Sequence, residues 1–262
     1  MAVSASAAPD KQLLVVSSPG SPGSTDEAQP RMDAFAAALS AKAGIPIAAV
    51  YDPSDSGGAK RFAKAGLGIV SLPFFLEHEQ ALGLHARLDA VQKGRPPLER
   101  WALVAQKGRI KGADGLAGFT IVSNAAFAPA FVRGSVLGDY GALPANVKLS
   151  QSGAVLSSLR RAAAGEPIAV LLDGSQAASL ASLPFASKLE VVTRSPPMPA
   201  DLVVTIDSRM PARDWSAIDR ALQALPSDPG GAATLEAIQL DRFVPLDDKA
   251  LAAARRAYAK VP

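Results

Sequence analysis

Short apolar runs alternate with helical patterns over the first third of the chain. Residues 13–18, LLVVSS, form a continuous apolar run ending in small polar residues, which is typical of a buried parallel strand. In the segment 31–44, Phe35 and Leu39 share one apolar helical face, and Gly44 ends the pattern. Further strands are expected at 45–50 and 67–72, and further helices at 58–66 and 74–82. Strands joined by crossover helices predict a parallel sheet covered on both faces.

The pattern changes after residue 84. Residues 84–106 predict a hairpin, in which KGRPP is the turn between LHARLDAVQ and ERWALVAQ. A second α/β series of alternating strands and helices then follows. Its strands are expected at 119–122, 147–151, 167–173 and 188–194, and its helices at 127–137, 153–165 and 174–182.

The segment 195–206, SPPMPADLVVTI, contains closely spaced prolines before an apolar strand. Proline lacks an amide donor and fixes φ, so the segment predicts a rigid extended connector. The tail is expected to be helical at 214–225, 231–240 and 248–261, interrupted only by DRFVPLD. We therefore predict an α/β protein with two lobes, residues 11–100 with 201–262 and residues 101–200, joined by two extended hinge crossings. Ligands in such folds bind at the carboxyl ends of the strands, which here face the cleft.

Composition restricts the function classes. The 262 residues are 48% hydrophobic and 19% charged with a net charge of +3, which indicates a globular protein without a basic stripe for nucleic acid. No apolar run approaches the roughly 20 residues of a membrane-spanning helix. The sequence has no cysteine, which excludes disulfides, thiolate metal sites and cysteine nucleophiles. His78 and His85 lack further ligands at metal spacing, so neither a metal nor a cofactor is expected.

The first twelve residues, MAVSASAAPDKQ, contain the small-residue arrangement Ala5-Ser6-Ala7. No basic region and no apolar region precede it, as they would in a whole export signal. Two interpretations therefore stay open, a disordered tail or the remainder of a removed export signal. The lack of cysteine fits either the cytoplasm or the periplasm.

Three stretches together resemble one family. They are the crossing SPPMPADLVV (195–204), the tail GAATLEAIQLDRFVPLDD (231–248) and the strand-helix-strand unit within 42–75. The ordered set is similar to the type II periplasmic solute-binding proteins of the phosphonate, phosphite and phosphate ABC transporters. The resemblance implies a monomeric, periplasmic, non-catalytic protein that closes two lobes on a small-molecule ligand and delivers it to an ABC permease.

The second lobe departs from this family at its ligand loop. The family carries Asp-Pro-x-Ser-Thr-Ser-Gly there, whose hydroxyls and amides hold phosphoryl oxygens. The matching stretch VSNAAFAP keeps Ser123 and Asn124 but has Ala125, Ala126 and Phe127 in place of the hydroxyl run. Because each hydrogen bond to a charged acceptor contributes about 1.5–3 kcal/mol, phosphonate capture should be weakened. We expect a less charged ligand that uses the face of Phe127, or a protein that no longer binds the family's ligand.

Candidate ligand contacts lie on the loops that follow the strands of both lobes. Asp55 is better explained as a helix cap than as a ligand contact, whereas the two roles are equal for Asp173, and Phe74 is favoured over Phe75 for the cleft. Two other functions stay open: an enzyme on the same fold with Asp55, Asp173 and Ser123 as reactive groups, or a ligand sensor for a membrane signalling partner. The candidates are Ser18, Ser54, Asp55, Leu72, Pro73, Phe74, Ser123, Asn124, Ala125, Phe127 and Asp173.

Overall fold

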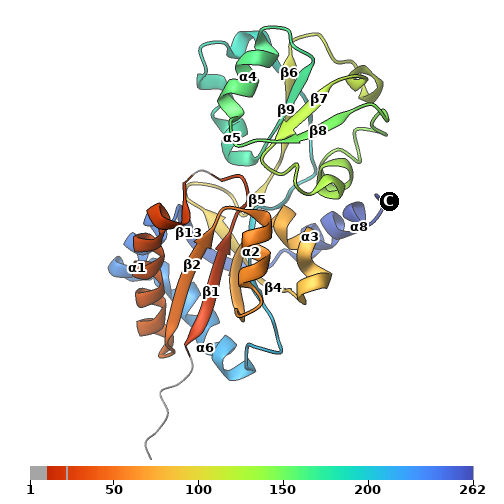
Figure 1. Cartoon of the computed structure of the whole chain (residues 1–262). Helices are drawn as coiled ribbons and strands as arrows, with labels where there is room; N and C mark the ends of the chain where they lie inside the picture. The colour runs from red at the N-terminus through yellow and green to blue at the C-terminus, as the bar shows by residue number, and fades with distance from the viewer. Residues whose placement is uncertain (1–10, 22, 262) are drawn as a thin grey trace, which may run out of the picture.

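The computed structural model describes residues 11–21 and 23–261, and it divides into two α/β lobes (Figure 1). The small-residue motif Ala5-Ser6-Ala7 lies outside the described residues. The chain builds part of the first lobe, crosses to the second, and returns to complete the first. This is the type II periplasmic binding protein architecture that the sequence predicted.

The first lobe contains a six-stranded sheet in the order β13-β4-β12-β3-β1-β2. Strands β1, β2 and β3 are parallel, as the crossover helices predicted, while β12 runs antiparallel to both β3 and β4. The returning chain therefore enters the middle of the sheet. The strands are β1 (Gln12–Ser17), β2 (Ile47–Asp52), β3 (Leu67–Ser71), β4 (His85–Gln92), β12 (Asp201–Thr205) and β13 (Leu240–Pro245).

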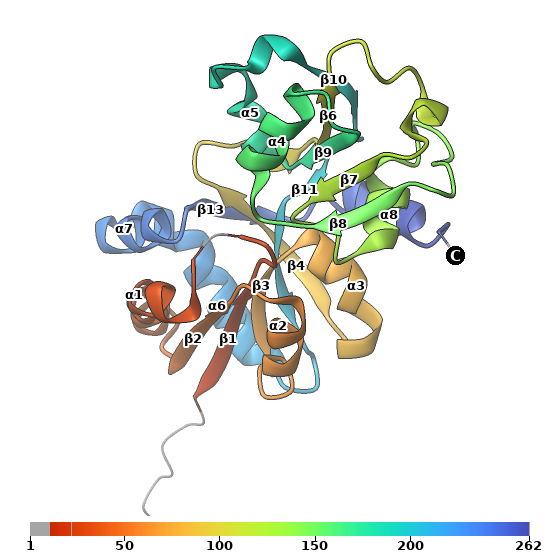
Figure 2. The ribbon, with the colours of Figure 1, turned by 45° about the horizontal axis from the view of Figure 1, so that its top comes forward.

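The second lobe contains a five-stranded sheet in the order β10-β6-β9-β7-β8. Strand β7 is parallel to both β8 and β9, so the carboxyl ends of these three strands meet at one edge. That edge faces the first lobe (Figure 2). The strands are β6 (Ala102–Gln106), β7 (Thr120–Ser123), β8 (Lys148–Gln151), β9 (Ile168–Leu172) and β10 (Leu189–Arg194).

Helices cover both sheets. Helix α1 begins ahead of the predicted residue 31, because Ser24 and Glu27 form a capping box at its start. The α-helices are α1 (Thr25–Ala43), α2 (Asp55–Arg61), α3 (Leu72–Leu82), α4 (Val155–Ala163), α5 (Gly174–Ala178), α6 (Ala212–Ala224), α7 (Pro229–Ala237) and α8 (Asp248–Tyr258). Other helical segments are η1 (Ala113–Leu116), the π-helical η2 (Phe131–Val136), η3 (Leu180–Ser182), η4 (Ala186–Lys188) and η5 (Leu225–Ser227).

The predicted hairpin at 84–106 is wrong. Strands β4 and β6 lie in different sheets, and the segment between them is the first crossing. Its short strand β5 (Leu98–Glu99) pairs with β11 (Met198–Pro199) of the second crossing, which forms a two-stranded connection between the lobes (Figure 2). Two apolar runs around a Gly-Pro turn look alike whether the strands pair with each other or separate, so local sequence could not decide between these outcomes.

The expected helical tail is also corrected. The sequence predicts a helix to residue 240 and a break at 241–247, but residues 240–245 form the edge strand β13 and pair antiparallel with β4. The exposed and buried positions do not alternate strictly along it, because the register shifts between Leu240 and Arg242. A bulged edge strand therefore gives a weak period-two signal.

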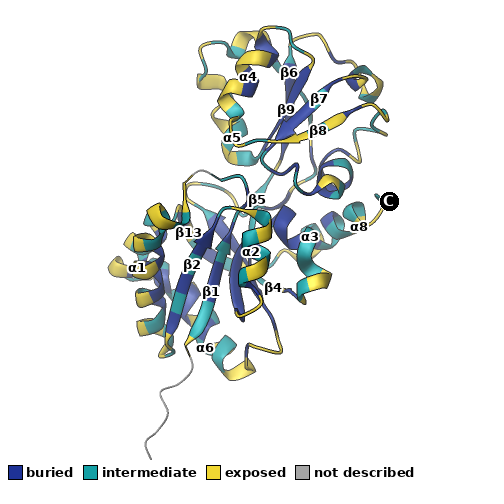
Figure 3. Ribbon diagram, viewed as in Figure 1, coloured by how far each residue is buried: buried dark blue, intermediate teal, exposed yellow. Residues whose placement is uncertain are grey.

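An apolar core joins the lobes on one side. The largest buried cluster contains Phe75 of α3, Phe131 of η2 and Leu251 of α8, so it extends across the lobe boundary. Trp101, at the end of the first crossing, packs edge-on against Phe131 with 5.3 Å between ring centres. Figure 3 shows the buried strands and the exposed outer faces of α1 and α4. The cleft thus opens on the side away from this shared core.

Candidate functional site

The space between the lobes contains a cavity of about 1120 Å³. The first lobe contributes the ends of β1 and β2, the start of α1 and the α7–β13 junction, and the second lobe contributes the ends of β7 and β9 and the start of α4. The carboxyl ends of the parallel strands therefore face the cavity, as predicted.

In the part of the chain that the structure describes, no helix is long and apolar enough to cross a membrane.

The lobes touch at one end of this cavity. Gly20, in the loop after β1, approaches Asn124 so closely that a Cβ atom added to Gly20 would lie 2.8 Å from the Asn124 Cβ. The same added atom would lie 2.9 Å from the Asn124 backbone oxygen. Gly20 has φ of 79° and donates its amide to the Pro53 carbonyl at 3.2 Å, which fixes the loop to the first lobe. Only glycine fits here without strain.

Two carboxyl groups line the hinge side of the cavity. Asp201 begins β12 and accepts a hydrogen bond at 2.7 Å from Gln92 Nε2. Asp173 follows β9 and accepts the Gln176 amide at 2.8 Å and the Asn124 side-chain amide at 3.4 Å. Burial raises the pKa of Asp201 to about 6 despite the Gln92 bond, and burial also raises the pKa of Asp173. Neither carboxyl forms an ion pair within 4 Å among residues 11–21 and 23–261, and Arg95 offsets the charge of Asp173 only in part.

Glu99 of β5 lies behind these two groups, in the hinge. Its Oε2 accepts the Gly174 amide at 2.8 Å. Burial, followed by the negative charge of Asp173, raises the pKa of Glu99 to about 8, so its neutral form prevails at pH 7. The hinge thus carries the three carboxyl groups of Glu99, Asp173 and Asp201. Repulsion between their negative charges makes ionisation of all three at once unfavourable.

Positive groups, together with Glu27, line other parts of the cavity. Arg31 of α1 and Arg95 of the first crossing form no ion pair with the described residues, whereas Lys93 pairs with Glu236. The first turn of α4 also lines the cavity and has no capping side chain. Free amides at a helix start attract anions because they combine unpaired donors with the positive end of the helix dipole. The cavity therefore offers both an anion-binding side and a cation-binding side.

Comparison with known proteins identifies the family. Residues 21–251 match the model described as "ABC transporter, phosphonate, periplasmic substrate-binding protein". The chain belongs to this family. Its members are substrate-binding proteins that take up a small-molecule ligand and work with an ABC permease. No curated protein matches the sequence.

Solved structures show the same fold at low sequence identity. A Xanthomonas citri protein bound to ATP is 15% identical with a TM-score of 0.75, the match covering 95% of this chain and 98% of that one. PhnD1 from Prochlorococcus marinus in complex with methylphosphonate is 14% identical with a TM-score of 0.65, at 95% and 98% coverage. A phosphonate ABC-transporter binding protein from Pseudomonas aeruginosa is 16% identical with a TM-score of 0.66, at 95% and 86% coverage.

Three of the predicted site residues line the cavity of this phosphonate-family protein. Ser18 follows β1, Asn124 follows β7, and Asp173 follows β9. Asp173 also caps α5 through a capping box with Gln176, so the two roles considered for it occur together. These three candidates therefore share one cavity, at the carboxyl ends of parallel strands.

The other first-lobe candidates lie elsewhere. Ser54 caps α2 by accepting the Gly57 amide at 3.2 Å, and Asp55 contacts His78 Nε2 at 2.6 Å, neither residue lining the cavity. Phe74 is 0% exposed and packs between Phe62 and His78. The neighbouring candidates Leu72 and Pro73 are also buried. These three side chains start α3 and face the core, because this apolar turn is covered by the lobe's own helices.

The second-lobe loop is less open than its sequence suggested. Ser123 is fully buried, donates its hydroxyl to the Leu171 carbonyl at 3.0 Å and accepts the Ala125 amide at 3.2 Å. Ala125 is buried, and Phe127 packs against the shared core cluster instead of lining the cavity. The expected stacking of a ligand on Phe127 therefore has no support in the described conformation. The proposed reactive trio of Asp55, Asp173 and Ser123 does not converge on the cavity.

Sequence reasoning missed Arg31, Gln92, Arg95 and Asp201. Arg31 follows Pro30 on the polar face of α1, and Asp201 is the first polar residue after the closely spaced prolines of the second crossing. A charged residue at the start of an otherwise apolar crossing strand can indicate a cavity-lining position.

Within the described residues, no group of three His, Cys, Asp or Glu side chains is arranged to hold a metal.

Proposed function

We propose that this substrate-binding protein captures a zwitterionic phosphonate-like solute, one that carries a phosphoryl group and an ammonium group, and delivers it to an ABC permease from the periplasm. The observation that supports this is the presence of both acidic and basic groups in the cavity. Asp173 and Asp201 line the hinge side, with Arg95 acting on Asp173, while Arg31, Glu27 and the open start of α4 also line the cavity.

The anionic end of the ligand is assigned to α4 and Arg31. The amides of Leu156 and Ser157 are first-turn donors without a capping side chain. Arg31 forms no ion pair within 4 Å in the described part of the chain, although, after the hydrogen bonds of the α1 capping box, its charge contributes to lowering the pKa of Glu27. These donors replace the hydroxyl run that the loop at 123–127 lacks. Charge-assisted hydrogen bonds of this kind contribute about 1.5–3 kcal/mol each.

The cationic end is assigned to Asp173 and Asp201. Both carboxyls are half-buried, so ionising them without a partner is costly, and a ligand ammonium supplies the missing charge. We expect binding to lower the pKa of both groups because a cation nearby favours the carboxylate. The lobes would then be held together through one ligand that contacts Asp173 of the second lobe and Asp201 of the first.

The test compares two ligands that differ by one amino group. Isothermal titration of 2-aminoethylphosphonate and ethylphosphonate should give tighter binding of the amine. Asp201→Asn should weaken 2-aminoethylphosphonate by about 10- to 100-fold, the loss of one charged hydrogen bond, and change ethylphosphonate by less than about 2-fold. Asp139→Asn, an exposed carboxyl in the second lobe, is the matched control and should change neither.

Two results would contradict the proposal. Equal effects of Asp201→Asn on both ligands would remove Asp201 from ammonium binding. Because similar folds hold methylphosphonate in one protein and ATP in another, the panel should include phosphate and ATP. Tight binding of ATP with no binding of either phosphonate would exclude a phosphonate ligand.

A further inference from the structure

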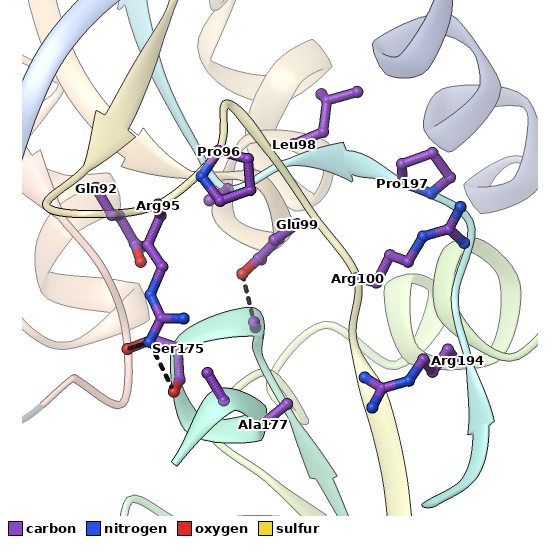
Figure 4. Close-up of a pocket in the computed structure, with 13 residues that line it drawn as sticks. Gln92, Arg95, Pro96, Leu98, Glu99, Arg100, Ser175, Ala177, Arg194 and Pro197 are labelled. Carbon is purple, nitrogen blue, oxygen red and sulfur yellow. Dashed lines mark hydrogen bonds between the residues drawn. The ribbon is translucent and has the colours of Figure 1, made fainter.

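A second cavity lies in the hinge, beside the ligand cleft. Its volume is about 400 Å³, within the range of about 300–1,000 Å³ that small-molecule sites occupy. Its walls come from the first crossing, the second crossing and α5. Figure 4 shows Glu99 inside it, with Arg95 on one side and Arg100 and Arg194 on the other.

The hinge cavity is separate from the ligand cleft. The two share Gln92, Arg95 and Ser175, and the Arg95 guanidinium donates to the Ser175 carbonyl at 3.2 Å between them. This contact joins the first crossing to α5 where the two cavities adjoin (Figure 4). Arg100 and Arg194 line only the hinge side of it.

The hinge cavity has an excess of positive charge. Arg95 and Arg100 belong to the first crossing and Arg194 ends β10. None of them has a carboxylate within 4 Å among the residues that the structure describes, although Asp173 offsets the charge of Arg95 in part. Arg100 donates to the Ser195 carbonyl at 2.9 Å, which leaves most of its donors free. The one acid present, Glu99, is largely neutral at pH 7 because burial raises its pKa to about 8, so it does not compensate them.

We propose that this hinge cavity is a second binding site, distinct from the ligand cleft, for a compact organic anion with a phosphoryl or carboxylate head and an apolar body. Arginine matches both heads because its planar donors bind two oxygens at once. The apolar body fits against Pro96, Leu98 and Pro197, which line the same cavity. The site goes beyond the proposed function, since it neither uses Asp201 nor requires a ligand in the cleft.

The experiment uses phenylphosphonate and benzoate as probes of the two heads. Trp215→Phe leaves Trp101, which directly follows Arg100, as the remaining tryptophan, so its fluorescence reports on the hinge. At least one probe should bind the protein saturably. Its affinity should fall at least 10-fold in Arg100→Gln/Arg194→Gln, and by a smaller factor in Arg194→Gln alone. Lys107→Gln/Lys111→Gln, which removes two exposed charges from the same lobe, should leave the affinity unchanged.

The cleft variant Arg31→Gln separates this inference from the proposed function. Probe binding that is lost in Arg31→Gln and kept in Arg100→Gln/Arg194→Gln would place the anion in the cleft and overturn the hinge site, as would the lack of saturable binding to the wild type. Failure of 2-aminoethylphosphonate to bind would count against the proposed function alone. Circular dichroism should show that the double variant is folded, and Arg194→Gln, whose side chain is exposed, provides a second folded variant.

Discussion

Substitution of Gly20 tests whether the two lobes must approach each other for binding. An alanine Cβ at this position would lie 2.8 Å from the Asn124 Cβ, about 1 Å inside the usual carbon–carbon contact distance. Forcing extra atoms into such a contact costs about 1–3 kcal/mol. The cost applies to the arrangement in which the lobes touch, because Gly20 belongs to the first lobe and Asn124 to the second.

Gly20→Ala should therefore raise the dissociation constant of the bound phosphonate by about 5- to 150-fold. The positive φ of 79° adds a conformational cost of about 1–2 kcal/mol, which falls on the open and closed forms alike and lowers only the unfolding free energy. Gly44→Ala is the matched control, because Gly44 has φ of 67° and an added Cβ there has no neighbour within 4 Å.

Isothermal titration gives the affinity, and thermal unfolding gives the stability of each variant. We expect similar losses of melting temperature for Gly20→Ala and Gly44→Ala, with an affinity loss only for Gly20→Ala. Equal affinities for the two variants would refute the reasoning, because the approach of Gly20 to Asn124 would then have no part in ligand capture.

Further predictions concern the carboxyl groups and the core. The folded-state pKa of Glu99 is about 8 and lies above its unfolded value, so the folded state holds more protons and the unfolding free energy should fall as pH rises from about 5 to 8. Urea unfolding should show a smaller fall for Glu99→Gln than for the wild type. An identical pH dependence of the two proteins would contradict the raised pKa of Glu99. Phe74→Ala should lower the unfolding free energy by about 3–5 kcal/mol without a direct effect on ligand contacts, since Phe74 is fully buried; a protein of unchanged melting temperature would exclude this core role. Ser24→Ala should lower the unfolding free energy by about 1 kcal/mol, because it removes the α1 capping box. Urea unfolding should compare it with Ser182→Ala, since the Ser182 hydroxyl bonds only to the nearby Ser179 carbonyl. An equal loss of unfolding free energy in both variants would argue against the cap.

Sequence alone determined the α/β class, most strands of both sheets and the position of the cleft. The apolar run at β1, the buried strand β9 and the proline-rich second crossing carry local signals, because burial on both faces and fixed φ angles follow from residue type. The same logic placed Ser18, Asn124 and Asp173 at strand ends, and all three line the cavity.

Tertiary structure decided which strands pair and which side chains face the cleft. Strand β4 pairs with β12 and β13, far along the chain, so the apparent hairpin could only be resolved in three dimensions. Phe74 and Ser123 stand beside cleft residues in sequence, yet they are covered by neighbouring elements, whereas Arg95 and Asp201 are brought to the cleft by the two crossings. Strand signals arise from local backbone preference and burial, but the side chains that line a cavity depend on which distant segments cover them.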